Sequence, residues 1–234
     1  MRLDVLKGLN AARRERRAGA IVTRLADGDQ RFVEADALGA DPLAAEIETA
    51  LRTGKSGVVT VAGDDYFLTV QAPSPRLTVI GAVHVSQALA PMARIAGLDV
   101  AIIDPRTAFA TPERFPETPV FAQWPDEALA DAPLDRFTAV CLLTHDPKID
   151  DPALKIALEA DCFYIGALGS RKTHARRLER MRAAGFDDTA LARIHAPIGL
   201  DIGAVSPAEI AVSIMGEIVA SLRKKPLRSE SAAA

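Results

Sequence analysis

The chain has 234 residues, of which 28 are Lys or Arg and 31 are Asp or Glu, so its formal net charge at pH 7 is −3. This near balance gives no electrostatic attraction for nucleic acid, so no nucleic-acid partner is expected. Hydrophobic residues make up 49% of the chain. No stretch approaches the roughly 20 uninterrupted apolar residues of a membrane helix, so no membrane partner is expected either.

The amino terminus carries an acidic residue, Asp4, and has no apolar block before its basic cluster. It is therefore unlike a signal peptide, and a cytoplasmic location is expected. The two cysteines, Cys141 and Cys162, lie 21 positions apart, each within an apolar run. This spacing is typical neither of a disulfide framework nor of a cysteine metal site, so we expect reduced, buried thiols and no metal.

Residues 1–73 predict a small α+β domain without chemistry of its own. The segment has no His, no Cys and no glycine-rich phosphate loop. Turn residues follow two of its apolar runs, at Asp27-Gly-Asp and Gly63-Asp-Asp, which indicates two β-hairpins. A proline-rich stretch at residues 72–76 predicts the domain boundary. We expect helices at residues 4–17 and 41–53, and hairpin strands at 20–25, 31–34, 57–61 and 66–70.

Residues 74–226 alternate short β-branched runs with helix-like runs. Such alternation predicts a parallel sheet with helices on both faces, a Rossmann-like doubly wound α/β fold. Ser206, Pro207 and Glu209 form a capping box that predicts the start of the last helix, and residues 227–234 are expected to be a flexible tail. The expected strands are 77–80, 100–103, 119–122, 138–143 and 162–165, and the expected helices 85–96, 126–130, 152–160, 172–184 and 207–224.

The first strand of this domain ends at Gly81, where a dinucleotide-binding fold has its G-x-G-x-x-G loop, but two of the three glycines are missing. Asp104 lies 23 positions later, at the place of a ribose-binding carboxylate. Alternatively, Asp104 only terminates a strand. Val83 replaces the second glycine, and its branched side chain disfavours positive φ and a close approach of diphosphate. NAD(P) is therefore not the expected cofactor.

The fourth strand ends in a polar run, Thr144, His145 and Asp146. With the usual strand order 3-2-1-4-5, the first and fourth strands meet at the topological switch point, where such sheets bind ligands. His84 and His145 would then face one crevice, with Thr144 as a hydrogen-bond donor. Asp146 can orient His145 or act as a base, or it can simply cap the next helix.

The fifth strand runs into a glycine-containing turn and a basic helix. Such a turn frees backbone N–H groups at a helix start, and the helix adds partial positive charge, so the loop suits an anion. Arg176 and Arg180, further along this helix, are expected to face solvent. Gly199 and Asp201, in a later loop, are expected at the edge of the same site. The residues expected to bind the anion are Gly166, Gly169, Ser170, Arg171, Lys172 and Thr173.

Several segments together resemble a known family. Residues 77–115, 144–147, 162–174, 193–204 and 206–211 are similar to the Rossmann domain of the xanthine dehydrogenase accessory proteins, the XdhC/CoxI type. The resemblance implies a non-catalytic maturation factor for molybdenum hydroxylases, such as xanthine dehydrogenase or aerobic carbon monoxide dehydrogenase. Such a factor binds the molybdenum cofactor (molybdopterin), assists its sulfuration and delivers it to the apoenzyme.

The chain departs from this family at its amino terminus. Relatives carry a larger domain there with a Ser-Gly-Gly-Cys-type segment, whereas residues 1–73 have no cysteine. A separate small accessory protein or the hydroxylase itself is therefore expected as partner, in contact with residues 1–73, and a homodimer is left open. Two other functions stay open: an NAD(P)-dependent oxidoreductase with Asp104 on ribose and His145 as acid or base, and a Rossmann-fold interaction protein without ligand. No catalytic residue is assigned.

Overall fold

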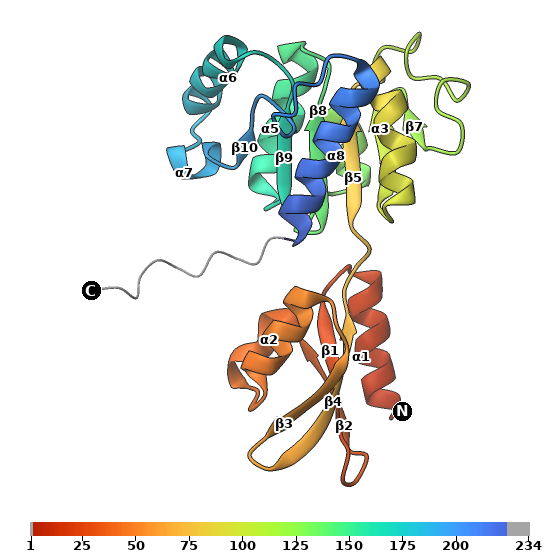
Figure 1. The fold of residues 1–234 in the computed structure, drawn as a ribbon, viewed down its shortest axis with the longest axis vertical. Helices are drawn as coiled ribbons and strands as arrows, with labels where there is room; N and C mark the ends of the chain where they lie inside the picture. Colours follow the sequence, from red (N-terminus) through yellow and green to blue (C-terminus); the bar gives the residue numbers. More distant parts are fainter. Residues whose placement is uncertain (1, 224–234) are drawn as a thin grey trace. The chain divides into compact units, whose positions relative to one another are not determined.

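The computed structural model describes residues 2–223, so the tail expected at residues 227–234 lies outside the described residues. The chain divides into two compact units between Pro73 and Ser74. Figure 1 colours the first unit from red to orange and the second from yellow to blue. No helix in the described part of the chain has both the length and the apolar character needed to cross a membrane.

The first unit is built on an antiparallel four-stranded sheet with strand order β2-β1-β4-β3. Successive residues of β1 point to opposite faces of the sheet, and both faces are covered. Val22 packs with Ile47 of the second helix, whereas Ile21 packs with Leu9 of the first. The elements are α1 (Leu3–Arg14), β1 (Gly19–Arg24), β2 (Gln30–Glu34), η1 (Ala35–Ala40), α2 (Ala44–Thr53), β3 (Gly57–Val61) and β4 (Asp64–Gln71).

The second unit contains a parallel sheet of six strands in the order β10-β9-β8-β5-β6-β7. This is the doubly wound order predicted from the sequence, with β5 and β8 adjacent at the centre (Figure 1). The strands are β5 (Arg76–Ile80), β6 (Asp99–Ile103), β7 (Val120–Phe121), β8 (Thr138–Leu142), β9 (Tyr164–Ala167) and β10 (Ile194–His195).

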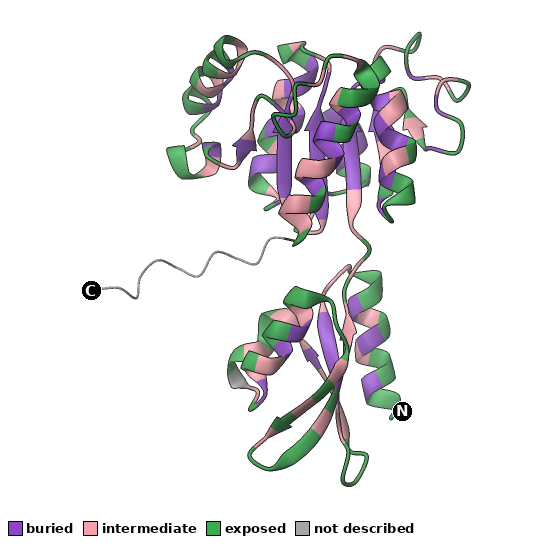
Figure 2. Cartoon of the chain, viewed as in Figure 1, coloured by how far each residue is buried: buried purple, intermediate pink, exposed green. Residues whose placement is uncertain are grey.

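Helices cover both faces of this sheet, and Figure 2 shows the strands as a buried layer between them. Val79 contributes to the core that contains Leu89 and Ile214, whereas its neighbour Ile80 contributes to the core that contains Leu154. The helices are α3 (His84–Ile95), α4 (Pro125–Asp131), α5 (Pro147–Glu159), α6 (Arg171–Ala183), α7 (Asp188–Leu191) and α8 (Pro207–Arg223).

Several elements differ from the predictions: η1 was not predicted, and β9 covers residues 164–167 instead of 162–165. Helix α5 begins at Pro147 instead of residue 152, because Asp146 caps it and Pro147 occupies its first position. Strand β10 and helix α7 were not predicted, since two and four residues are too short to show periodicity. The predicted capping box of α8 is confirmed: Glu209 N–H donates to Ser206 Oγ (3.2 Å), and Ser206 N–H donates to Glu209 Oε2 (2.9 Å).

Candidate functional site

The candidate site lies at the carboxyl edge of the parallel sheet, where the loops after β5 and β8 meet. The last residues of these strands, Ile80 and Leu142, are register partners. Gly81 follows with φ +116°, and a Cβ there would lie 2.8 Å from Cγ2 of Thr144. A glycine is therefore required for the two loops to pack together. They meet at the topological switch point, the usual ligand position in open α/β sheets.

The loop after β8 is organised by Thr144. Its Oγ1 donates to Asp150 Oδ1 (2.7 Å) and accepts the N–H of Asp146 (3.0 Å). His145 between them is exposed and has φ +63°, a left-handed conformation uncommon for a residue with a side chain. Such conformations cluster at functional sites because the surroundings must hold them. The carboxylate of Asp146 accepts the N–H of Lys148 (2.9 Å), so it caps α5 and is not seen to orient His145.

Asp104 does not present a free carboxylate for ribose. Its side chain is fully buried, and Oδ2 accepts the N–H of Ala82 (2.8 Å) and Arg106 Nη2 (2.7 Å), while Oδ1 accepts Arg106 Nε (2.9 Å). Burial by itself would raise the pKa of Asp104, but the hydrogen bonds from Arg106 and Ala82 outweigh it and hold this pKa below its usual value. Asp104 therefore has a structural role, because it ties the loop after β5 to the end of β6.

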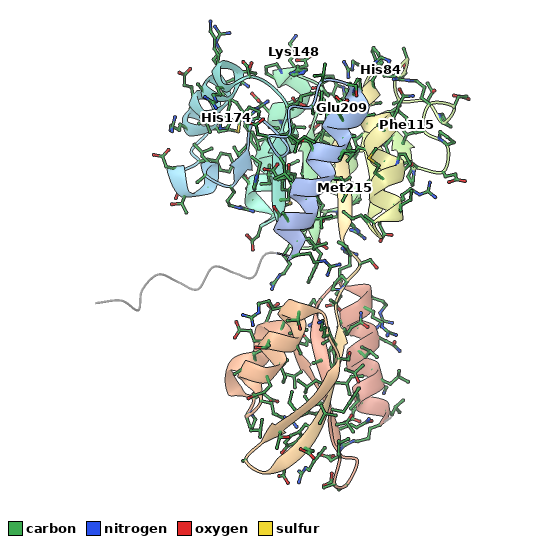
Figure 3. The ribbon with its side chains drawn as sticks, viewed as in Figure 1. His84, Phe115, Lys148, His174, Glu209 and Met215 are labelled. Atoms are coloured by element: carbon green, nitrogen blue, oxygen red, sulfur yellow. The ribbon has the colours of Figure 1, made fainter. Side chains whose placement is uncertain are left out.

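The loop after β5 uses its own N–H groups internally. Ala82 N–H donates to Asp104, and Val83 N–H donates to Ser86 Oγ (3.3 Å). Val83 is extended (φ −103°), so the strain expected from positive φ is absent, and its partly buried side chain packs against the core. His84 is exposed in the first turn of α3, and Figure 3 shows it at the same end of the unit as Lys148.

The predicted anion loop after β9 is only partly arranged for a ligand. Gly166 lies inside β9, where a Cβ would come within 2.6 Å of the Tyr164 hydroxyl, so it serves core packing and not ligand binding. Gly169 has φ +131° and packs against Thr173. Ser170 caps α6 by accepting the N–H of Thr173 (3.2 Å). The other two predicted residues of this loop, Arg171 and Lys172, are exposed.

A pocket of about 230 Å³ lies between α5 and α6, beside the loop after β8. Of the predicted site residues, His145 and Thr173 line it, whereas the others do not. Arg180, expected to face solvent, pairs with Asp151 (Nη2 to Oδ1, 2.9 Å). The pocket residues are His145, Pro147, Asp150, Thr173, Arg176, Arg177 and Arg180.

The two most buried polar residues of this pocket were not predicted from the sequence. Asp150 and Arg177 are each only 2% exposed. Burial raises the pKa of Asp150, and it lowers the pKa of the Arg177 guanidinium. A usable signal exists in the sequence: Arg177 stands four residues before the buried Met181, on the inward face of α6.

The loop with Gly199 and Asp201 is fixed by Glu217 of α8. The carboxylate of Glu217 accepts the Tyr164 hydroxyl (2.6 Å) and the N–H of Gly199 (2.8 Å), and it lies 2.9 Å from His195 Nδ1. Burial opposes ionisation, yet these hydrogen bonds together hold the pKa of Glu217 below its usual value. Gly199 therefore packs against α8, while Asp201 is exposed.

The two thiols are buried, as predicted. Burial raises the pKa of Cys141 far above its usual value and that of Cys162 to about 12, so both stay protonated near neutral pH. Among residues 2–223, no three His, Cys, Asp or Glu side chains gather in a group able to hold a metal ion.

Comparison with known proteins assigns the family. The family model described as the XdhC Rossmann domain matches residues 77–218, which is more than half of the chain. The chain belongs to the XdhC family. Relatives in Escherichia coli (strain K12) are the molybdenum cofactor insertion chaperone PaoD, 36% identical over 64% of this chain and 41% of PaoD, and YqeB, 32% identical over 72% of this chain and 32% of YqeB.

A further relative and a solved structure are also similar to this chain. A protein of Bacillus subtilis (strain 168), named as a probable xanthine dehydrogenase subunit, is 30% identical over 65% of this chain and 44% of that protein. A crystal structure of a xanthine dehydrogenase from Bacillus halodurans has the same fold, with a TM-score of 0.66 at 21% identity over 94% of this chain and 65% of that one. The chain thus spans less than half the length of the curated relatives it matches.

Proposed function

We propose that this protein is a cytoplasmic maturation factor for molybdenum hydroxylases, which binds the molybdenum cofactor at the carboxyl edge of its Rossmann unit and passes it to the apoenzyme. The observation that carries this proposal is the basic pocket between α5 and α6, in a domain of the XdhC family. The relative PaoD, named as a molybdenum cofactor insertion chaperone, supports it. The proposed role is that of a carrier and not of a catalyst.

The donor set of the pocket suits one part of this cofactor. The cofactor is a pterin whose dithiolene binds the metal, here called its metal end, and whose side chain ends in a phosphate. When bound, it supplies the hydroxylase with its reactive metal. Arg176, Arg177 and Thr173 provide the cations and hydroxyl that an anionic group requires. A volume of about 230 Å³ is sufficient for a phosphate group.

The metal end has no matching ligand among the described residues. Cys141 and Cys162 are buried and protonated, so neither offers a thiolate to the metal. We therefore propose that a partner contacts the metal end. Two partners fit: a small accessory protein with the cysteine segment that residues 1–73 lack, or the hydroxylase apoenzyme.

The test is purification of the protein from a host with ample molybdate and from a host unable to make the pterin. We expect pterin fluorescence after acid oxidation, and an absorbance band above 300 nm, only in the first preparation. A protein that carries no pterin above the level of the second preparation would refute the proposal. Added NAD serves as a comparison, since an oxidoreductase would bind it instead.

A further inference from the structure

Arg177 is a buried cation whose hydrogen-bonding capacity is mostly unused. Its side chain, on α6, lines the pocket and is 2% exposed. Nη2 donates to the carbonyl of Leu168 (2.9 Å), but Nε and Nη1 are buried and have no hydrogen-bond partner in the described part of the chain. A guanidinium has five N–H groups, so three of them, one on Nε and two on Nη1, are unsatisfied. Leaving buried charged donors unpaired is costly.

The acidic residues near Arg177 are already engaged elsewhere. Asp150 accepts the hydroxyl of Thr144, and Asp151 forms a two-bond pair with Arg180. Neither forms a hydrogen bond with Arg177 in the described chain. Asp150 and Asp151 act on Arg177 through their charge alone, so no anion is hydrogen-bonded to Arg177 in the described chain.

Two further lining residues, Thr173 and His145, can also bind an anion. Thr173 comes from the first turn of α6, where the helix end is partially positive, and its hydroxyl lies 3.1 Å from Ser170 Oγ. His145 reaches the pocket from the loop after β8, whose left-handed backbone at this residue is held by Thr144. An imidazole offers an N–H donor in either protonation state. Donors from two elements thus surround one buried cation.

We propose that this pocket is a phosphate-monoester site, in which Arg177 binds the phosphate oxygens from below and Thr173, Arg176 and His145 bind them at the mouth. The inference rests on the proposed function: it identifies the phosphate as the part of the cofactor that enters this pocket. It also moves the anion site from the predicted residues, Arg171 and Lys172, to residues about one and a half turns further along α6.

Titration calorimetry and thermal unfolding with inorganic phosphate test this site on the full chain. We expect saturable binding and a melting temperature that rises with phosphate concentration. Arg177→Met should weaken binding at least tenfold while the melting temperature without phosphate is unchanged or higher, because a buried unpaired charge is removed. Arg182→Met is the matched control: Arg182 lies on the same helix, paired with Asp188 at the surface, and should leave binding unchanged.

A second variant and two further ligands complete the binding experiment. Arg176→Met is a second variant, also expected to weaken phosphate binding, should Arg177→Met fail to fold. Phenyl phosphate should bind at least as well as inorganic phosphate. NAD should not compete, because its two phosphates form a diphosphate bridge and it has no phosphate monoester. Equal phosphate affinity in wild type, Arg177→Met and Arg176→Met would overturn the inference, as would competition by NAD. If the pterin co-purifies but phosphate does not bind, the inference fails while the proposed function stands. If phosphate binds but no pterin co-purifies, the phosphate site stands while the proposed function fails.

Discussion

A buried carboxylate and a half-buried one hold the loops of the candidate site in place. Asp104, at the end of β6, accepts the N–H of Ala82, and Glu217 of α8 accepts the N–H of Gly199. Both loops lack regular structure, so these hydrogen bonds to charged groups replace the support that a sheet or helix provides. Asp104, whose sequence position predicts a contact with ribose, thus supports the loop beside it.

Asp104→Asn tests this support. The variant keeps the shape of the side chain but loses the charge that Arg106 and the N–H of Ala82 bind. We expect a loss of about 1.5–3 kcal/mol in the free energy of unfolding at pH 7, the usual contribution of hydrogen bonds to a charged group. Urea denaturation measures it, and Asp99→Asn, an exposed residue of β6, is the control.

The stability difference between the wild-type protein and Asp104→Asn should also depend on pH. The pKa of Asp104 is lowered in the folded state, so its stabilising effect is complete above the usual value of 3.8 and is lost as the pH falls through the folded pKa. The difference in unfolding free energy between wild type and Asp104→Asn should therefore be constant from pH 5 to 7 and shrink below about pH 4. A difference that grows on acidification would contradict the assignment.

The thiols give a second prediction at the residue scale. Because burial keeps Cys141 and Cys162 protonated and shielded, iodoacetamide at pH 8 should alkylate neither in the native protein. Both should react fully in denaturant, and mass spectrometry counts the added groups. Rapid alkylation of either cysteine in the native protein would show that this chain has an accessible thiolate. That thiolate could bind the metal, so the case for a partner at the metal end would be weaker.

At the scale of elements, the turn from β5 into α3 decides whether a dinucleotide can bind. In a dinucleotide fold this turn offers free N–H groups to the diphosphate. Here the N–H groups of Ala82 and Val83 are already bound to Asp104 and Ser86. We therefore expect NAD and NADP to bind with dissociation constants of about 1 mM or weaker, equivalent to about −4 kcal/mol.

Val83→Gly separates two explanations for this weak binding. If the branched side chain alone excludes the diphosphate, the glycine variant should gain affinity. Since Val83 is extended and its N–H is occupied by Ser86, we expect titration calorimetry to show no gain. Micromolar binding of NAD to the wild-type protein would instead support the oxidoreductase alternative.

The sequence predicted the sheet well because its signals are local. Runs of β-branched residues coincide with β5, β6 and β8, and their order in the sheet follows from the doubly wound topology. Strand β10 escaped prediction because its two residues, Ile194 and His195, have no pattern of their own and are placed by pairing with β9. Local patterns cannot reveal such pairing.

The candidate site was harder to predict for the same reason. The loops after β5 and β8 were correctly expected to meet, since the switch point depends on strand order alone. The pocket depends on which face of α6 packs against α5. Their place at a helix start after a glycine-containing turn favoured Arg171 and Lys172, yet both are exposed, while Arg177 is buried beside Asp150. Only tertiary packing decides which arginine of α6 is buried away from solvent.

At the scale of the whole molecule, each unit has a hydrophobic core of its own. The first is built around Ile47 and Leu68, and the second around the two faces of the parallel sheet. The first unit also exposes Val58 and Phe67, which are register partners on β3 and β4.

A chain that contains only the second unit tests which unit binds phosphate and which contacts the partner. A chain of residues 74–234 should fold by itself and bind inorganic phosphate within twofold of the full chain, because the pocket and both cores lie within the second unit. In a pull-down from the native host, the full chain should recover a molybdenum hydroxylase component or a small accessory protein, and the shorter chain should recover less. Equal recovery would assign the partner contact to the Rossmann unit. Recovery by neither chain would count against a partnered maturation factor, even where phosphate binding is intact.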